Sequence, residues 1–137
     1  NWNSRISKKD TAYFLGDFCF CNLTEGQRIL DSLNGNKHLI RGNHEKIGSK
    51  LKGWASVSDY KEIKIGEQNI VLCHYAMRTW NKQHYKSWML YGHSHGSLPD
   101  DPNALSIDVG VDCHSYCPVS MDELQEIMSR KQFVYPF

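Results

Sequence analysis

Oxygen and nitrogen donors occur at four points along this 137-residue chain, each after a glycine or a cysteine. The four points are Gly16-Asp17, Gly42-Asn43-His44, Cys73-His74 and Gly92-His93-Ser94-His95. Carboxylate, amide and imidazole groups together suit manganese, iron, zinc or nickel, and they suit neither calcium nor a thiolate-seeking ion. Any one of these residues alone would be an ordinary cap or surface side chain, but the whole series predicts a divalent transition-metal site.

Each point follows a short apolar run with the length and composition of a buried strand. The runs are Tyr13-Phe14-Leu15, His38-Leu39-Ile40, Ile70-Val71-Leu72 and Trp88-Met89-Leu90-Tyr91. In open α/β sheets the ligand site lies beyond the carboxyl ends of the strands. The polar side chains that follow the runs can therefore converge on one place.

A helix is expected between the first two runs. Thr24-x-x-Gln27 fits a capping box, and Ile29, Leu30 and Leu33 supply one apolar face. Gly35 then ends the helix. Strand, helix and strand together predict a βαβ unit.

The second half of the chain predicts a sheet of mixed direction. Ile63 and Ile65 alternate with charged residues, residues 66–69 form a turn, and the third apolar run returns as a hairpin partner. Residues 104–111 are a further strand candidate. Ser120-x-x-Glu123 forms a capping box for a last helix, and Val119 in front of it is placed to pack on Leu124.

Composition bounds the class of protein. With 40% apolar residues the chain can bury a core as a single domain over residues 1–137. Sixteen basic and fifteen acidic residues leave a formal charge of +1, which argues against a dedicated nucleic-acid binder. No apolar run approaches the ~20 residues of a membrane span, and no hydrophobic signal core opens the chain. We therefore expect a soluble, cytoplasmic protein without a membrane partner.

The cysteines favour free thiols in a reducing setting. Five cysteines leave at least one unpaired, and Cys73 lies in an apolar run, as a small buried hydrophobe would. Cys19-x-Cys21 and Cys113-x-x-x-Cys117 could form a four-thiolate zinc site, but neither has the usual spacing of two residues between the thiols. That alternative is the less favoured one.

The blocks Gly16-Asp17, Arg41-Gly42-Asn43-His44-Glu45, Cys73-His74 and Gly92-His93-Ser94-His95 resemble the signature blocks of the calcineurin-like metallophosphoesterases. The resemblance covers nearly the whole chain, and it implies an α/β fold made of a two-sheet sandwich of mixed β-sheets flanked by helices. It also implies two divalent transition-metal ions (Mn, Fe, Zn or Ni). Asp17 would bridge them, Asn43, His74 and His93 would bind the second ion, and His95 would bind the first.

The same resemblance implies hydrolysis of phosphate mono- or diesters by a metal-bridging hydroxide, on a small phosphate-ester substrate. His44 would be the general acid for the leaving oxygen, and Glu45 would orient it or stabilise its charge. Arg41 would clamp the phosphate, because a guanidinium can hold two oxygens at once; the alternative is an ordinary surface arginine. The histidines outside the blocks are expected to be ordinary: His38, His84 and His114.

This sequence departs from the family pattern at its beginning. The family's other ligands of the first metal come from an Asp-x-His block on an N-terminal strand, and no such block precedes Gly16-Asp17. We therefore expect a domain that is incomplete at its N-terminus and holds only one ion by itself. The unpaired sheet edge left without that strand favours self-association or pairing with another segment.

Two other interpretations stay open. A degenerate domain that binds one metal or none could serve as a non-catalytic interaction module. A nuclease or repair subunit of the same superfamily is an interpretation that the near-zero charge weakens.

The segment Met77–Trp88 could form a wall of the substrate cleft, or it could be a surface excursion anchored by Trp80 and Trp88.

Overall fold

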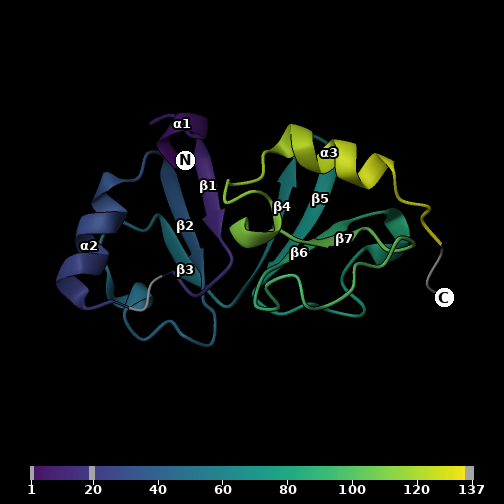
Figure 1. Cartoon of the computed structure of the whole chain (residues 1–137). Coiled ribbons are helices and arrows are strands. Elements are labelled where there is room, and N and C mark those ends of the chain that lie inside the picture. The colour runs from purple at the N-terminus through teal and green to yellow at the C-terminus, as the bar shows by residue number, and fades with distance from the viewer. Residues whose placement is uncertain (1, 19–20, 135–137) are drawn as a thin grey trace.

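The computed structural model describes residues 2–18 and 21–134, and its strands form two sheets (Figure 1). The first sheet has the order β1 (Thr11–Phe14), β2 (Asn36–Ile40), β3 (Ser56–Ser58), and all three strands are parallel. The second has the order β4 (Tyr60–Ile65), β5 (Gln68–Cys73), β6 (Trp88–Tyr91), β7 (Ser106–Asp108). In it β4 is antiparallel to β5, while β5, β6 and β7 are parallel.

This arrangement confirms the expected α/β fold of two sheets flanked by helices and corrects one detail of it. Only the second sheet is mixed, as the hairpin of β4 and β5 requires. The first sheet is wholly parallel, because a helical crossover joins β1 to β2 and β3 enters beside β2 in the same direction.

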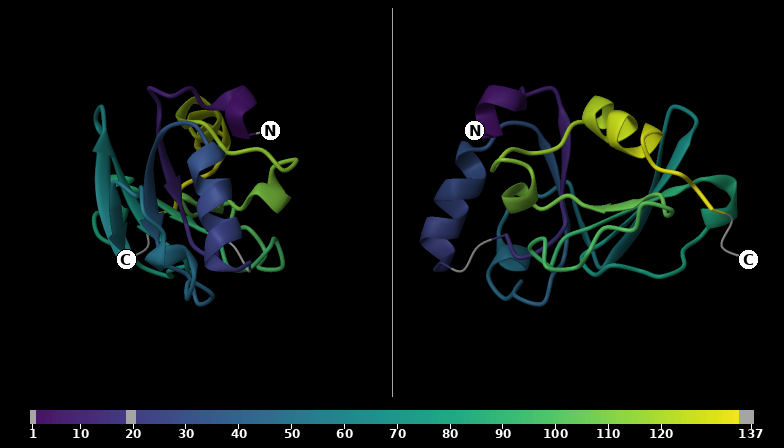
Figure 2. Two further views of the ribbon diagram at one scale, coloured as in Figure 1. Left: turned by 90° about the vertical axis from the view of Figure 1, so that its left-hand side faces the viewer. Right: turned by 45° about the vertical axis from the view of Figure 1, so that its right-hand side comes forward.

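Three α-helices and three short 3-10 turns complete the described residues. The helices are α1 (Trp2–Arg5), α2 (Leu23–Ser32) and α3 (Met121–Ser129). The 3-10 turns are η1 (Gly48–Lys50), η2 (Gln83–Tyr85) and η3 (Val111–Cys113). Figure 2 shows α2 beside the parallel sheet and α3 across the mixed one. Among the described residues no helix is long and apolar enough to cross a membrane.

The helix α2 begins earlier than the capping box at Thr24 predicted. Asn22 is its N-cap, and the side-chain oxygen of Asn22 accepts a hydrogen bond from the Glu25 amide at 2.8 Å. Asparagine is among the best N-cap residues, so the helix starts directly after Asn22, at Leu23. Leu30 is buried on the inner face, and the βαβ unit is confirmed.

The helix α3 has the capping box that the sequence predicted. Ser120 Oγ accepts from the Glu123 amide, and a Glu123 carboxylate oxygen accepts from the Ser120 amide, both at 3.1 Å. Leu124 and Met128 are buried in the same cluster as Leu72. The strand before this helix is shorter than residues 104–111, because the chain turns into η3 after Val109 and Gly110.

The two faces of the mixed sheet have different covers. Ile70, Leu72 and Leu90 belong to the core beneath α3, whereas Val71 and Met89 point to the other face. Trp80 packs with that second group, and its indole N–H donates to the Ser87 carbonyl at 3.1 Å. Trp80 therefore anchors the segment Met77–Trp88 on this face, whereas Trp88 begins β6 and packs in the cluster beneath α3.

The cysteines are free wherever the structure describes them. The four described cysteines, Cys21, Cys73, Cys113 and Cys117, form no disulfide. Cys73 is half-buried and packs at the edge of the Val71 cluster, so it is less enclosed than its apolar run predicted. The four-thiolate alternative involves Cys19, which lies outside the described residues.

Candidate metal centre

Four of the predicted ligands meet where the strands end. His74 Nε2 lies 3.0 Å from Asn43 Oδ1, 3.1 Å from His93 Nδ1 and 3.3 Å from Asp17 Oδ2. His93 Nδ1 is in turn 3.2 Å from Asn43 Oδ1. These residues follow β1, β2, β5 and β6, so both sheets contribute to one cluster, as strand-end loops do in open α/β folds.

His74 lies at the centre of the cluster and its tautomer is fixed. The residue is 2% exposed, and its Nδ1 is 2.5 Å from the Leu15 carbonyl oxygen. A carbonyl only accepts, so Nδ1 must donate, and the lone pair of the neutral ring is then on Nε2. That lone pair faces the amide oxygen of Asn43 and the carboxylate of Asp17. Electron-pair donors held this close repel one another unless a proton or a metal ion lies between them, and the mixture of carboxylate, amide and imidazole donors fits a divalent transition-metal ion.

The Asp17 carboxylate is oriented by the neighbouring loop. Its Oδ1 accepts from the His44 amide at 2.8 Å, which leaves Oδ2 toward His74. Such outer hydrogen bonds hold metal ligands in place. Asp17, His93 and His95 all have a left-handed backbone, with φ of 55°, 58° and 49°. Non-glycine residues adopt this conformation rarely, and they do so preferentially at functional sites.

Two glycines allow the loops to touch. A side chain at Gly16 would overlap His74 Nδ1 and would lie 2.7 Å from the Gly42 Cα. A side chain at Gly42 would overlap the Asp17 carboxylate and lie 2.8 Å from His74 Cε1. The glycines that precede Asp17 and Asn43 in the sequence blocks are thus required by close packing of the backbone.

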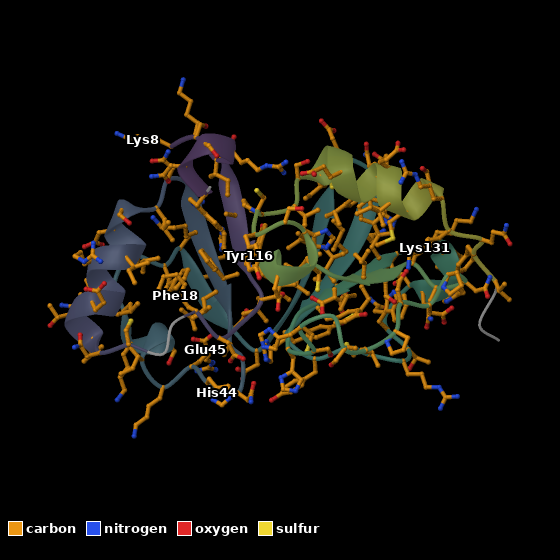
Figure 3. The ribbon with its side chains drawn as sticks, viewed as in Figure 1. Lys8, Phe18, His44, Glu45, Tyr116 and Lys131 are labelled. Atoms are coloured by element: carbon orange, nitrogen blue, oxygen red, sulfur yellow. The ribbon has the colours of Figure 1, made fainter. Side chains whose placement is uncertain are left out.

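Glu45 accepts a hydrogen bond from the loop that follows β1. Its carboxylate is buried, and Oε1 accepts from the Phe18 amide at 3.1 Å, whereas Oε2 has no hydrogen-bond partner within the described residues. Burial raises the pKa of this carboxyl. Figure 3 shows Phe18, Glu45 and His44 along the loops that follow β1 and β2, with His44 exposed. Glu45 therefore ties the Asp17 loop to the Asn43 loop.

Arg41 is already engaged by a carboxylate. Its Nε and Nη2 donate to Asp59 Oδ1 and Oδ2 at 2.7 and 3.0 Å, and this pair raises the pKa of the guanidinium. Both side chains are largely exposed. Arg41 would have to exchange Asp59 for a phosphate in order to act as a clamp.

His95 stands apart from the four converged residues. Its side chain is 71% exposed, and its Nδ1 is 2.8 Å from Asp112 Oδ2. Sequence reasoning missed Asp112, although a signal was present, since Gly110-Val111-Asp112 follows a strand end as the recognised blocks do.

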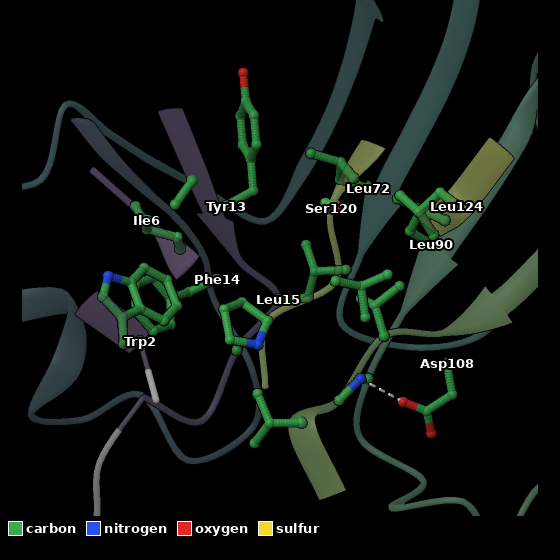
Figure 4. Close-up of a pocket in the computed structure, with 18 of the residues that line it drawn as sticks. Trp2, Ile6, Tyr13, Phe14, Leu15, Leu72, Leu90, Asp108, Ser120 and Leu124 are labelled. Carbon is green, nitrogen blue, oxygen red and sulfur yellow. Dashed lines mark hydrogen bonds between the residues drawn. The ribbon is translucent and has the colours of Figure 1, made fainter. Parts of the chain in front are cut away.

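A large cavity connects the cluster with the interior. Its volume is about 1350 Å³, beyond the ~300–1,000 Å³ of ordinary small-molecule pockets. The five consecutive residues 11–15 line one side, so β1 turns its backbone edge toward the cavity. Alternate residues of the second sheet, such as Ile70 and Leu72, line the other side. Figure 4 shows Leu15 facing Leu72 and Leu90 across this space.

The histidines expected to be ordinary have local partners. His38 stacks on Tyr13, its Nδ1 is 2.6 Å from Ser56 Oγ, and burial lowers its pKa. His114 Nε2 donates to the Asp108 carbonyl at 2.7 Å. His84 packs against the ring of Tyr85.

A parallel and a mixed sheet whose strand-end loops gather Asp17, His74 and His93 define an α/β protein with a candidate metal-binding centre. Within that class, the chain is 30% identical over 141 residues to the uncharacterized protein MJ1445 from Methanocaldococcus jannaschii. The match covers 98% of this chain and 74% of that protein, and the chain belongs to the MJ1445 family. No family model matches the sequence.

A solved structure shows the same fold. The protein of unknown function AQ665 from Aquifex aeolicus matches with a TM-score of 0.68 and 25% identity, over 93% of this chain and 81% of that one. A single mutant of Vps29 from Entamoeba histolytica matches more distantly, with a TM-score of 0.45 and 18% identity over 74% of this chain and 57% of that one.

Proposed function

We propose that this protein is a metal-dependent phosphoesterase that hydrolyses phosphate mono- or diesters. The observation that carries the proposal is the convergence of Asp17, Asn43 and His93 on the lone pair of His74. The order of these donors along the chain resembles that of the calcineurin-like metallophosphoesterases. A divalent pair bound there would supply Lewis acidity and a hydroxide at neutral pH.

The chain's own residues divide the remaining work. The four converged donors would hold one ion, and Asp17 and His95 would contribute to a second. His44 follows Asn43 on an exposed loop and has its amide fixed on Asp17. An imidazole exchanges protons near neutral pH, so His44 would protonate the leaving oxygen. Arg41 would release Asp59 and bind the phosphate oxygens.

We further propose that the domain is completed by an extended segment encoded upstream of Asn1. The cavity offers a free strand edge at residues 11–15 and an apolar sheet face opposite, which are the two surfaces that an inserted β-strand needs. The relatives are longer than the matched part, since this chain spans 74% of MJ1445 and 81% of AQ665. A strand parallel to β1 would end beside Asp17 and His95.

The test is an assay of the upstream-extended protein beside residues 1–137, with bis(p-nitrophenyl) phosphate and p-nitrophenyl phosphate. We expect turnover in manganese, nickel or zinc that chelators abolish, and slow or absent turnover in residues 1–137. His44→Ala should lower turnover about 10²- to 10⁴-fold while metal still binds. Equal activity of residues 1–137 and the upstream-extended protein would refute the proposed N-terminal strand. Equal activity of His44→Ala and the unsubstituted protein would remove His44 from the mechanism.

A non-catalytic metal-binding module is the second candidate. It is favoured by the engagement of Arg41 with Asp59 and by the separation of His95 from the other donors. Such a module would bind metal in the same experiment without hydrolysing either ester in any metal.

A further inference from the structure

His95 and Asp112 come from different loops, yet their side chains meet. His95 follows β6, Asp112 lies in η3 after β7, and His95 Nδ1 is 2.8 Å from Asp112 Oδ2. Both residues line the cavity that also reaches Asp17 and His74. The pair therefore stands beside the candidate centre without belonging to the donors that converge on His74.

A buried carboxylate holds the two loops together. Asp108, the last residue of β7, is 7% exposed; its Oδ2 accepts from the Gly96 amide at 3.2 Å and its Oδ1 from the Gly110 amide at 2.8 Å. Gly96 directly follows His95, and Gly110 caps η3. A Cβ at Gly110 would lie 2.9 Å from Asp112 Oδ1, so this glycine leaves room for the carboxylate. The backbone on both sides of the pair is thus fixed, unlike that of a chance surface contact.

The hydrogen bond selects one ring nitrogen of His95 for a cation. An ionised carboxylate only accepts, so Nδ1 of His95 carries the proton of the bond. In the neutral ring the lone pair is then on Nε2. Carboxylates that accept from the other nitrogen of a metal-binding histidine fix its tautomer and orientation and raise its basicity.

We propose that Asp112 is a positioning residue that holds His95 with Nε2 toward a second divalent ion, next to the one at His74. The inference rests on the proposed function, because it assumes a centre that holds two ions. Asp112 itself touches neither ion nor substrate. A surface ion pair without this role would leave metal binding unchanged.

The experiment is a Mn²⁺ titration of the upstream-extended protein by calorimetry and electron paramagnetic resonance, which separates the first ion from the second. Asp112→Ala should weaken the second ion about 10- to 100-fold and leave the first within about twofold. Asp112→Glu should recover part of the loss, and Asp122→Asn, on the exposed start of α3, is the matched control. In the metal-free protein, ¹⁵N chemical shifts of His95 should show a protonated Nδ1 that becomes mixed in Asp112→Ala.

Three results would overturn the proposal: an unchanged second ion in Asp112→Ala, equal weakening of both ions, or a His95 whose Nδ1 is unprotonated in the unsubstituted protein. The first of these leaves the proposed phosphoesterase intact, because two ions are still bound. If the protein binds only one ion and is fully active, the role proposed for Asp112 is wrong, because there is no second ion for His95 to bind, but the proposed phosphoesterase activity stands. Failure to bind any ion would refute both.

Discussion

The His74 side and the His95 side of the site differ in how they are built. His74 is 2% exposed and lies against side chains from three other strand ends, whereas the His95 side chain is 71% exposed and contacts one carboxylate, that of Asp112. The first is a packed junction of both sheets, and the second is a pair of loops at the mouth of a cavity. Burial and shared neighbours fix the side chains of the first side more firmly than a single hydrogen bond fixes those of the second.

The largest effect should come from removing the centre of the buried side. His74→Ala deletes the donor that the other three face, so the affinity for the first ion should fall by more than about 100-fold, beyond what loss of an outer-shell partner causes. Calorimetry with Zn²⁺ measures this. His114→Ala removes a histidine outside the cluster and should retain the affinity; an equal loss in both variants would mean that the centre is not where the donors meet.

A smaller loss is expected from disturbing the packing without touching a ligand. Gly42→Ala places a methyl group 2.8 Å from the Asp17 amide nitrogen and the His74 Cε1, so the loops must separate. We expect affinity for the first ion to fall about 10- to 100-fold, as when metal ligands lose their support. Gly66→Asn, at an open turn with φ of 60°, is the control. Unchanged metal affinity in Gly42→Ala would show that the ligands of the buried side bind the ion even when the two loops are further apart.

The reactivity of the Cys113 thiol reports on the carboxylates of Asp108 and Asp112 near it. Burial, together with Asp108 and Asp112, raises the pKa of Cys113 to about 11. At pH 8 its alkylation by iodoacetamide should be about 10- to 20-fold slower than in the urea-unfolded chain, because the thiolate is scarce although more nucleophilic. Mass spectrometry of the Cys113 peptide gives the rate. Asp112→Asn should accelerate it, and identical rates in folded and unfolded chains would contradict this description of the loop.

The smallest effect concerns Arg41, which lies at the rim of the buried side. Asp59→Asn weakens the exposed pair that occupies the guanidinium, so the KM for an aryl phosphate should fall by no more than about fivefold, with kcat nearly constant. Steady-state kinetics of the extended protein test this. A raised KM would mean that Asp59 supports the binding geometry of Arg41.

The sequence predicted most of the buried side because each ligand there sits at a local landmark. Asp17, Asn43, His74 and His93 can be predicted without knowledge of the fold, because each follows an apolar run and then a glycine or cysteine. Pairings between residues far apart in sequence leave no such trace. The bond from His74 to the Leu15 carbonyl and the pair of Arg41 with Asp59 emerge only when the strands are assembled, and the same is true of the contact of Asp112 with His95, although the position of Asp112 after a strand end is visible in the sequence.

Local competition explains the remaining differences. Asn22 and Thr24 are both able to cap α2, and the capping box at Thr24 competes with the stronger single cap at Asn22 two residues earlier. The sequence did not predict that the first sheet is wholly parallel. The short strand β3 contains no apolar run by which it could be recognised, and its direction is set by the loop that leads into it.

The hydrogen bond between His74 and Leu15 has a thermodynamic consequence. Leu15 continues the parallel sheet and His74 the mixed sheet, so an ion at His74 Nε2 would be shared by both halves of the molecule. Metal binding and the docking of the two halves then form one linked equilibrium. An ion present at 100 times its dissociation constant would add about 2.7 kcal/mol to the folded state. Chelation should accordingly lower the melting temperature.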